Sequence, residues 1–419
     1  MPLPLRRRTP TDTLTATLAD DERVRPALVS LSRERAWVNA QHLELCRVAA
    51  PTFMEQKRAA WMMEQFRALG CEARLDRGGN VVCFPYGDPG GDLVALTAHL
   101  DTVLAPRIPD DVRVGPDGRF FGPGVADNGA GLAALLAVAR VLKAHRIEEL
   151  SNLVICANVG EEGEGNLSGM RYLCRQSMLA HRLKSFVVLD GPGTESITCQ
   201  ALGSRRFEVL FQGPGGHSWG DFGTGNPIHA LSRVMADFSD LFVQGQPRAS
   251  FNFGMVEGGA SINSIPTEAR AKLDIRSEST DRMNALAEVL TDCVERSMAT
   301  ENARAAEMAV KAGRQVSSWR VTAKIREIGS RPGGRLPADS PLLESLRSVD
   351  RYCGIQALED CASTDANIPL SMGLPAVSLG AGGAGGGAHT ATEWYHPEGR
   401  ELALRRALLL LLHLARHVR

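Results

Sequence analysis

The sequence predicts an α/β protein in which a mainly parallel sheet is covered by helices and a smaller domain is inserted. Three observations support this fold class. Short apolar segments alternate with segments of helical periodicity through the first half of the chain, as in proteins built on a parallel sheet. From about residue 203 the order becomes strand, helix, strand, strand, helix, strand, which is the order of a ferredoxin-like unit. The length of 419 residues suits two or three domains.

The expected strands of the larger domain are runs dominated by Val, Ile, Leu and Phe. Strands that helices bury on both faces have this composition. The helix between the second and third strands is rich in Ala and Leu. The strands span residues 81–86, 93–100, 152–159 and 185–189, and the helix spans 131–142.

The expected elements of the smaller domain alternate in the ferredoxin-like order. The strands span residues 205–212, 250–256, 268–276 and 320–328, and the helices span 228–242 and 282–298.

The C-terminal part of the chain returns to the first pattern after the turn sequence RPGG at 331–334. We expect a helix over 342–352 and a strand over 376–379. The glycine-rich segment 380–388 is too biased in composition for a helix or a strand. The apolar run 407–412 is far shorter than the ~20 residues of a membrane helix, so we expect a buried core helix there.

These elements divide the chain into one domain of residues 1–202 and 331–419 and an inserted domain of residues 203–330. The Arg-rich segment 1–14 has no apolar stretch behind it. It therefore predicts a flexible arm rather than a secretory signal.

The composition excludes several functional classes. Lys and Arg total 47 against 48 Asp and Glu, so the chain lacks the basic excess of nucleic-acid-binding proteins. The nine cysteines are scattered singly and are odd in number. This pattern argues against a disulfide framework and an all-Cys zinc site, and it favours the reducing cytoplasm. We expect neither nucleic acid nor membrane as a partner.

Polar residues follow the expected strands at the point where each strand ends. His99 and Asp101 come at the end of one strand, where parallel sheets bind ligands. Asp101 can fix the tautomer of a metal-binding His99, although a hydrogen-bonded core pair explains the two residues as well. Asp127 lies in a glycine-rich turn before a helix, where it is either a metal ligand or a helix N-cap.

Three carboxylates lie between glycines after the strand at 152–159: Glu161, Glu162 and Glu164. Neighbouring carboxylates repel one another unless a cation compensates them, so a metal explains them better than an acidic surface loop does. Asp190 follows another strand, where turn initiation is an equally good explanation. His389 follows the glycine-rich segment, which offers no apolar face to pack it against.

The combination of these residues is more specific than any one of them. His99, Asp127, Glu162, Asp190 and His389 supply two imidazoles and three carboxylates. Such a set suits two divalent cations that share one carboxylate, as in many amide and phosphate hydrolases. Imidazole and carboxylate favour zinc, with cobalt or manganese as alternatives.

The sequence resembles the co-catalytic zinc aminoacylase/carboxypeptidase family, which includes peptidase T, acetylornithine deacetylase, succinyl-diaminopimelate desuccinylase and glutamate carboxypeptidase. The likeness extends over nearly the whole chain, with the peptidase T branch most similar. The motifs are TAHLDTV (97–103), GVADNGAG (124–131), GEEGEGN (160–166), GPGGHS (213–218), NSIPTEA (263–269), DIRS (274–277), STDAN (363–367) and GGGAHTATEWY (385–395).

The resemblance implies a role for each ligand candidate. Asp127 would bridge two metal ions, His99 and Asp190 would complete one site, and Glu162 and His389 would complete the other.

It also implies that Glu161 is the general base, that Asp101 orients His99, and that the peptide bond between Asp127 and Asn128 is cis. Position 128 is often acidic or Met in the family, so Asn128 is a departure from its pattern.

For the inserted domain, the resemblance implies a lid through which the chain forms a homodimer. His217 would stabilise the oxyanion in the partner's active site, and Arg276 with Asn263 would hold the substrate carboxylate. Without the resemblance, His217 reads as a surface turn residue and Arg276 as a strand residue paired with Asp274.

The function that follows is hydrolysis of an amide bond in a small peptide, as a dipeptidase, tripeptidase or carboxypeptidase. An N-acyl-amino-acid deacylase uses the same metal core and is the alternative. A non-catalytic, dimeric metal-binding homologue and a phosphohydrolase are alternatives from other classes. The retained Glu161 and Asp101 argue against the first, and the lack of a P-loop or an Arg/Lys cluster argues against the second.

Overall fold

The computed structural model describes residues 9–241 and 243–418, which form two compact units. Unit 1 holds the chain up to Ala201 and again from Gly334, and unit 2 holds Leu202–Gly333. Each unit has its own core of buried apolar side chains.

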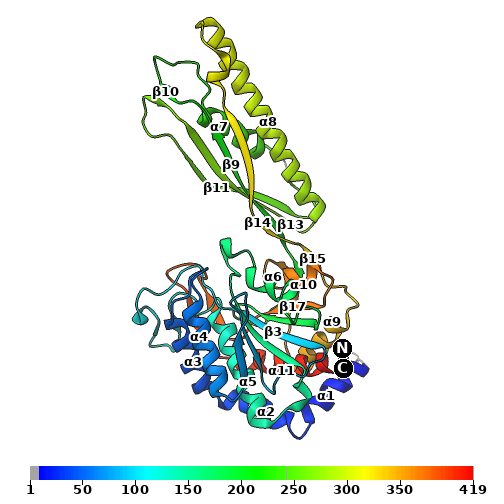
Figure 1. Cartoon of the computed structure of the whole chain (residues 1–419). Coiled ribbons are helices and arrows are strands. Elements are labelled where there is room, and N and C mark those ends of the chain that lie inside the picture. Colours follow the sequence, from blue (N-terminus) through cyan, green and yellow to red (C-terminus); the bar gives the residue numbers. More distant parts are fainter. Residues whose placement is uncertain (1–8, 242, 419) are drawn as a thin grey trace, which may run out of the picture. The chain divides into compact units, whose positions relative to one another are not determined.

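A nine-stranded mixed sheet forms the centre of unit 1, in the order β1-β2-β6-β3-β7-β17-β8-β15, with β16 paired to β8 (Figure 1). Its central strands β6, β3, β7 and β17 are parallel. The predicted fold class, a mainly parallel sheet covered by helices, is therefore confirmed. The strands are β1 (Glu72–Leu75), β2 (Val81–Phe84), β3 (Leu93–His99), β6 (Leu153–Asn158), β7 (Leu183–Leu189), β8 (Ser196–Ala201), β15 (Gly334–Arg335), β16 (Leu358–Ala362) and β17 (Ala376–Leu379).

Helices α5 and α11 pack against β3 and β7 and against each other. The Ala and Leu residues of α5 are almost all buried, and so is the whole Leu-rich run of α11, as a core helix requires. The helices of unit 1 with at least five residues are α1 (Pro10–Asp20), α2 (Val24–Arg33), α3 (Arg35–Arg47), α4 (Gln56–Ala68), α5 (Gly129–His145), α6 (Ser168–Arg175), α9 (Pro341–Cys353), α10 (Asn367–Ser371) and α11 (Arg400–His417).

The N-terminal segment differs from the prediction of a flexible arm. Residues 1–8 lie outside the described residues, but α1 begins at Pro10. Thr9 and Asp12 form a capping box, in which each side chain accepts a hydrogen bond from the backbone N–H of the other. This helix is rich in Thr and its apolar stripe is weak, so the sequence shows little helical periodicity here. Only the capping residues could have indicated a helix.

A small four-stranded sheet brings the C-terminal glycine-rich segment next to the turn before α5. Its order is β18-β19-β5-β4. The prediction that residues 380–388 form no strand is wrong for β18, because its backbone pairs with β19 although its side chains are small. The strands are β4 (Arg113–Val114), β5 (Phe120–Phe121), β18 (Ala384–Gly386) and β19 (Trp394–His396).

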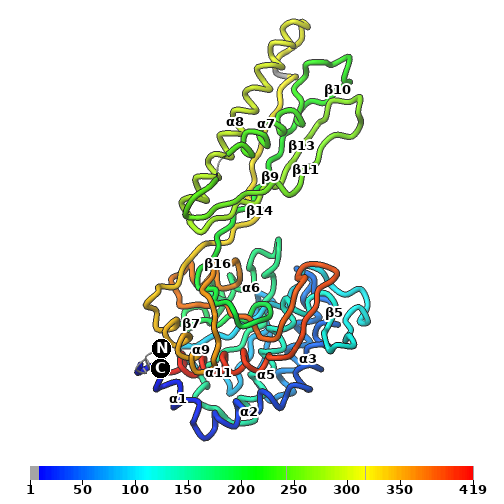
Figure 2. Tube along the Cα trace, turned by 180° about the vertical axis from the view of Figure 1, so that it is seen from behind, coloured from blue at the N-terminus to red at the C-terminus, as the bar shows by residue number. Residues whose placement is uncertain are grey.

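Unit 2 has the predicted order of elements, with a four-stranded antiparallel sheet in the order β11-β13-β9-β14 (Figure 2). Residues of β13 are alternately buried and partly exposed, so one face of this sheet packs on the helices. A short pair, β10 with β12, extends from it. The elements are β9 (Gly203–Gln212), β10 (Gly216–His217), α7 (Pro227–Ser239), β11 (Ala249–Gly258), β12 (Ser264–Ile265), β13 (Glu268–Ser277), α8 (Thr280–Lys311) and β14 (Thr322–Arg331).

Helix α8 is much longer than predicted, and α7 ends at Ser239, three residues before the predicted end at 242, which is not described. Among the described residues, no helix is both long and apolar enough to cross a lipid bilayer.

Helices α1, α9 and α11 pack against one another (Figure 2), and a buried histidine of α11, His413, takes part in their contacts. Nε2 of His413 lies 2.9 Å from Oγ1 of Thr15, which also contacts Ser348. Burial, with His417 and Arg416 nearby, lowers the pKa of His413 from 6.5 to about 4. The neutral imidazole is therefore the form that the folded state favours.

We predict that replacing His413 by Leu flattens the pH dependence of stability between pH 7 and 5. The pKa is lower in the folded state, so the unfolded chain takes up the proton first as pH falls below 6.5. At pH 5 this proton costs the wild type about 2 kcal/mol of unfolding free energy. Urea unfolding at pH 7, 6 and 5 measures the difference, with the exposed His181→Leu as control. Equal slopes for H413L and wild type would contradict the assignment.

Candidate metal centre

The candidate ligands gather at the carboxyl edge of the parallel strands of unit 1. His99 is the last residue of β3, and Asp190 directly follows β7. In the ladder between β3 and β6, His99 is paired with Asn158, so the segment with Glu161 and Glu162 leaves the sheet beside His99. Parallel strands present their carboxyl ends at one edge, which is why residues far apart in sequence meet here.

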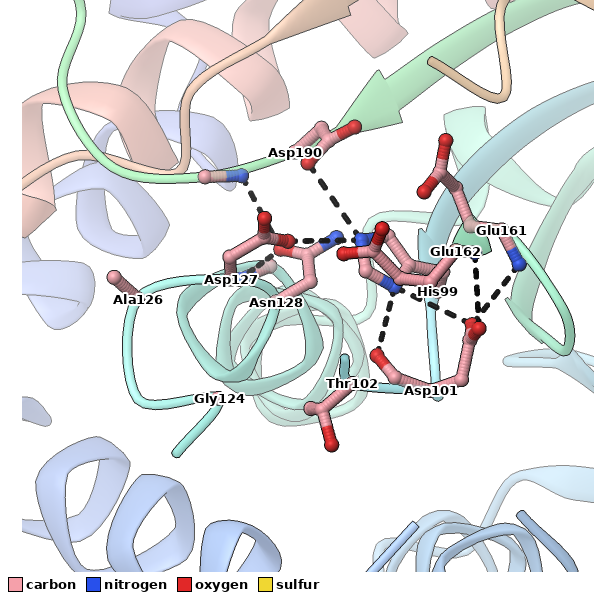
Figure 3. A network of polar contacts seen from close by, with 12 residues as sticks. His99, Asp101, Thr102, Gly124, Ala126, Asp127, Asn128, Glu161, Glu162 and Asp190 are labelled. Atoms are coloured by element: carbon pink, nitrogen blue, oxygen red, sulfur yellow. Dashed lines mark hydrogen bonds and ion pairs between the residues drawn. The ribbon is translucent and has the colours of Figure 1, made fainter. Parts of the chain in front are cut away.

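The carboxylate of Asp127 lies between two imidazoles. Its Oδ1 is 3.0 Å from Nε2 of His99, and its Oδ2 is 3.0 Å from Nε2 of His389. Each imidazole nitrogen also faces a second carboxylate: Nε2 of His99 is 3.7 Å from Oδ1 of Asp190, and Nε2 of His389 is 2.8 Å from Oε1 of Glu162. Figure 3 shows Asp127 and Asp190 directed at His99. The structure thus brings all five predicted ligands together.

The electrostatics of this cluster favour positive charge. Burial opposes a charged His99, but Asp101, Asp127 and Asp190 outweigh it and raise the pKa of His99 well above its usual value. The hydrogen bond to Asp127 raises the pKa of His389 to about 9, and Glu162 adds to this effect. Partial burial opposes the increase. A site with this potential is suited to hold cations.

The donor set fits divalent metal ions. Ligand atoms of His99, Asp127 and Glu162 all lie within 4.8 Å of one another. His99 is 2% exposed and Glu162 is 6% exposed, so their donor atoms are shielded from bulk water. Imidazole nitrogen together with carboxylate oxygen is the combination that zinc, cobalt and manganese accept.

Asp101 contacts several residues of the cluster through its backbone oxygen and its carboxylate. Nδ1 of His99 donates to the backbone oxygen of Asp101 at 3.0 Å, and the Asp101 carboxylate is farther away at 3.5 Å. That carboxylate instead accepts the backbone N–H groups of Glu161 and Glu162 at 3.0 and 2.9 Å, and the hydroxyl of Thr52 at 2.9 Å. Asp101 therefore fixes both the ring of His99 and the backbone of the two glutamates.

Glu161 is 4% exposed and lies beside the cluster. Figure 3 shows its side chain extending away from Asp101, which holds its backbone N–H. Burial raises the pKa of the neighbouring Glu162, against the opposing effect of His99.

The turn around Asp127 has the backbone that the resemblance implies. The peptide bond between Asp127 and Asn128 is cis. The N-cap of α5 is Asn128, whose side chain accepts the N–H of Gly131 at 3.1 Å, so the alternative role of Asp127 as helix cap is wrong. The side-chain amide of Asn128 also donates to the backbone oxygen of Leu189 at 2.8 Å. Asn128 thereby ties the Asp127 turn to the strand that leads into Asp190.

The two loop candidates of unit 2 lie together. His217 is paired with Ser264 between β10 and β12, and Ser218 N–H donates to the backbone oxygen of Asn263. The ring nitrogen Nδ1 of His217 accepts the N–H of Trp219 at 3.2 Å. His217 and Asn263 are both exposed.

Arg276 lies elsewhere in unit 2. It is near the end of β13 that pairs with Ser204, whereas the β13 end near Asn263 pairs with Gln212. Its Nε donates to Oδ2 of Asp274 at 2.6 Å, which is the structural role that the sequence left open. One copy of unit 2 therefore does not bring Arg276 and Asn263 together, and their joint role stays a prediction.

Sequence reasoning assigned no role to several polar residues at this site. Thr52 holds Asp101, and the buried Asp365 accepts the side-chain amide of Asn158 at 2.6 Å. Glu393 accepts three backbone N–H groups of the Asp127 turn. Asp365 and Glu393 lie inside two of the family motifs, STDAN and GGGAHTATEWY. Their position in these motifs was the one feature of the sequence that could have indicated a role.

Comparison with known proteins gives distant relatives. Carboxypeptidase G2 of Pseudomonas sp. (strain RS-16) is 24% identical over 194 residues, which are 45% of either chain. The chain thus spans about half the length of this curated relative. A tripeptidase from Staphylococcus aureus superposes with a TM-score of 0.70 at 20% identity, covering 91% of this chain and 99% of that one. A dinuclear metal-binding peptidase of family M20 from Bacillus subtilis gives 0.62 at 14% identity, covering 93% and 100%.

The family assignment rests on a longer match. The model of peptidase family M20/M25/M40 matches residues 95–417, which include all five candidate ligands, Asp101 and Glu161. With more than half of its length matched, the chain belongs to peptidase family M20/M25/M40.

Proposed function

We propose that the protein is a metal-dependent exopeptidase that hydrolyses an amide bond in a small peptide, as a dipeptidase, tripeptidase or carboxypeptidase. One observation carries the proposal: the two oxygens of Asp127 face two different imidazoles, and each imidazole faces a further carboxylate. This symmetry supports two cation sites that share Asp127.

His99 and Asp190 would hold one divalent cation with Asp127, and Glu162 and His389 would hold the other. Zinc is the ion that this donor set favours, and cobalt or manganese also fit it. When bound, such a pair of cations supplies Lewis-acid polarisation of a carbonyl and activation of water. The dinuclear peptidase from Bacillus subtilis supports the count of two.

The protein's own groups would move the proton. Glu161, buried beside the ligands, takes the proton from the attacking water and then passes it to the leaving amine. Asp101 positions this base through its backbone N–H and holds the Glu162 backbone in the same way. Because these groups are buried, bulk water competes little with them for the transferred proton.

Unit 2 is proposed as the lid through which two chains form a homodimer. Strand β11 lies at an edge of its sheet, where Met255 and Val256 are exposed. Trp219, Phe222 and Ile262 are exposed large apolar side chains around the loops with His217 and Asn263. In the dimer, His217 would stabilise the oxyanion, and Arg276 with Asn263 would bind the substrate carboxylate.

The alternatives are distinguished by substrate. An N-acyl-amino-acid deacylase would use the same ligands and base, so a panel of dipeptides, tripeptides and N-acyl amino acids separates the two. Cleavage of N-acyl amino acids alone would favour the deacylase. If metal binds and neither class is cleaved, the non-catalytic homologue is favoured. The nine cysteines all lie within the described residues and form no disulfide bond there, which supports the proposal of the reducing cytoplasm as the location.

We predict that purified protein contains two divalent ions per chain and that Asp127→Ala retains neither, because both sites lose their shared ligand. Elemental analysis for zinc, manganese and cobalt measures the content. Asp117→Ala, which removes an exposed aspartate ten residues earlier, should keep both ions. Removing the metal with a chelator should abolish peptide cleavage, and adding it back should restore cleavage. Two ions in D127A would exclude the shared-ligand arrangement.

We predict that Glu161→Gln keeps both metal ions but lowers kcat by about 10²–10⁴-fold, the range for loss of a general base. The amide matches the size of the carboxylate but cannot take up the proton. Glu164→Gln, in the same acidic segment but exposed, is the matched control and should leave kcat unchanged. Wild-type kcat in E161Q, measured with the best peptide of the panel, would show that another group is the base.

A further inference from the structure

The turn that carries Asp127 is held by a buried carboxylate from the C-terminal segment. Oε1 of Glu393 accepts the N–H groups of Ala126 and Asp127 at 2.8 and 2.9 Å, and Oε2 accepts the N–H of Gly124 at 2.8 Å. Glu393 is 3% exposed. Three N–H groups on one buried carboxylate fix the orientation of the turn, since each would be costly to leave unpaired.

The opposite side of the same turn is held by α3. His42 Nδ1 lies 2.5 Å from the guanidinium of Arg400, which can only donate, so Nδ1 is the acceptor. The N–H therefore sits on Nε2 and is donated to the backbone oxygen of Val125 at 2.7 Å. Cys46 Sγ donates to the oxygen of Gly124 at 3.4 Å. The N–H groups of the turn thus meet Glu393, and its carbonyls meet α3.

Glu393 also belongs to the segment that carries another ligand. His389 lies four residues before it, and the backbone oxygen of Glu393 accepts the N–H of Gly122 at 3.1 Å, at the start of the Asp127 turn. Strand β19 then pairs with β5 directly before that turn. The side chain and the backbone of Glu393 therefore both join the His389 segment to the Asp127 turn.

We propose that Glu393 is a positioning residue of the metal centre, which sets the Asp127 carboxylate and the His389 imidazole at the spacing that two cations require. This inference rests on the proposed function. Glu393 itself touches neither imidazole in the described contacts, and it acts through the backbone of the turn and through the chain to His389.

The carboxylate is needed because three donors converge on two acceptor oxygens. In Glu393→Gln, one oxygen becomes an NH₂ group, which would face a backbone N–H donor. The variant keeps the size and the burial of the side chain, so it changes the hydrogen bonds of the turn without opening a cavity. A matched control is Glu398→Gln, five residues further on, whose side chain is 78% exposed.

The test is a calorimetric titration of metal-free protein with Zn²⁺, supported by a cobalt titration followed by visible absorption. Glu393→Gln should weaken the affinity by about 10–100-fold, the range for residues that orient metal ligands, while E398Q binds like the wild type. With saturating metal, kcat should fall and KM should change little, because the reacting geometry rather than substrate binding is disturbed.

A merely structural role predicts a different result: a lower unfolding temperature for E393Q but wild-type affinity for Zn²⁺ at temperatures where it is folded. That result would overturn the inference and leave the proposed function intact. If the wild type itself binds no Zn²⁺, Co²⁺ or Mn²⁺, the proposed function fails and the inference with it. Should E393Q not fold, Glu393→Asp, which keeps the charge at shorter reach, takes its place in the same titration, and wild-type affinity would overturn the inference equally.

Discussion

The sharing of one carboxylate, that of Asp127, between two imidazoles is the constraint on which the organisation of unit 1 depends. Buried charges are tolerated only where opposite charges or hydrogen bonds compensate them. His99 and His389 meet this requirement for Asp127, and they hold its pKa well below the usual range in spite of its desolvation. The arrangement requires three residues that are distant in sequence, His99, Asp127 and His389, to lie within hydrogen-bond distance.

Two different kinds of contact bring these ligands together. Strand register places His99, at the end of β3, beside Asp190, which directly follows β7. Glu162 lies beyond the end of β6, and the Asp101 carboxylate holds its backbone. Asp127 and His389 come from irregular segments, which have no ladder to fix them. The backbone of the Asp127 turn is instead held by side chains, from α3 on one face and from Glu393 on the other.

The same distinction explains which features the sequence predicts and which it does not. Buried parallel strands are continuous apolar runs, so β3, β6 and β7, and the polar residues at their ends, could be predicted from local pattern. Helices α1 to α4 were not predicted. The apolar stripe of α1 is weak. Helix α2, in contrast, has buried residues at helical spacing, which local pattern does reveal: Val24, Ala27, Leu28 and Leu31. His42 and Glu393 contact backbone groups, which look the same at every residue, so local pattern does not predict these contacts. The position of Glu393 inside the motif GGGAHTATEWY was its only signal in the sequence.

Asp101 shows why single substitutions at such a site differ in what they reveal. Its backbone oxygen accepts Nδ1–H of His99, while its carboxylate holds the backbone of Glu161 and Glu162. Loss of the Asp101 carboxylate therefore disturbs a ligand and the proposed base at once, and the two effects cannot be separated by rate alone. A change at Glu161 leaves both contacts of Asp101 to the backbone in place, because they involve N–H groups rather than the Glu161 side chain. The hydrogen-bond topology thus determines which substitution isolates proton transfer from metal binding.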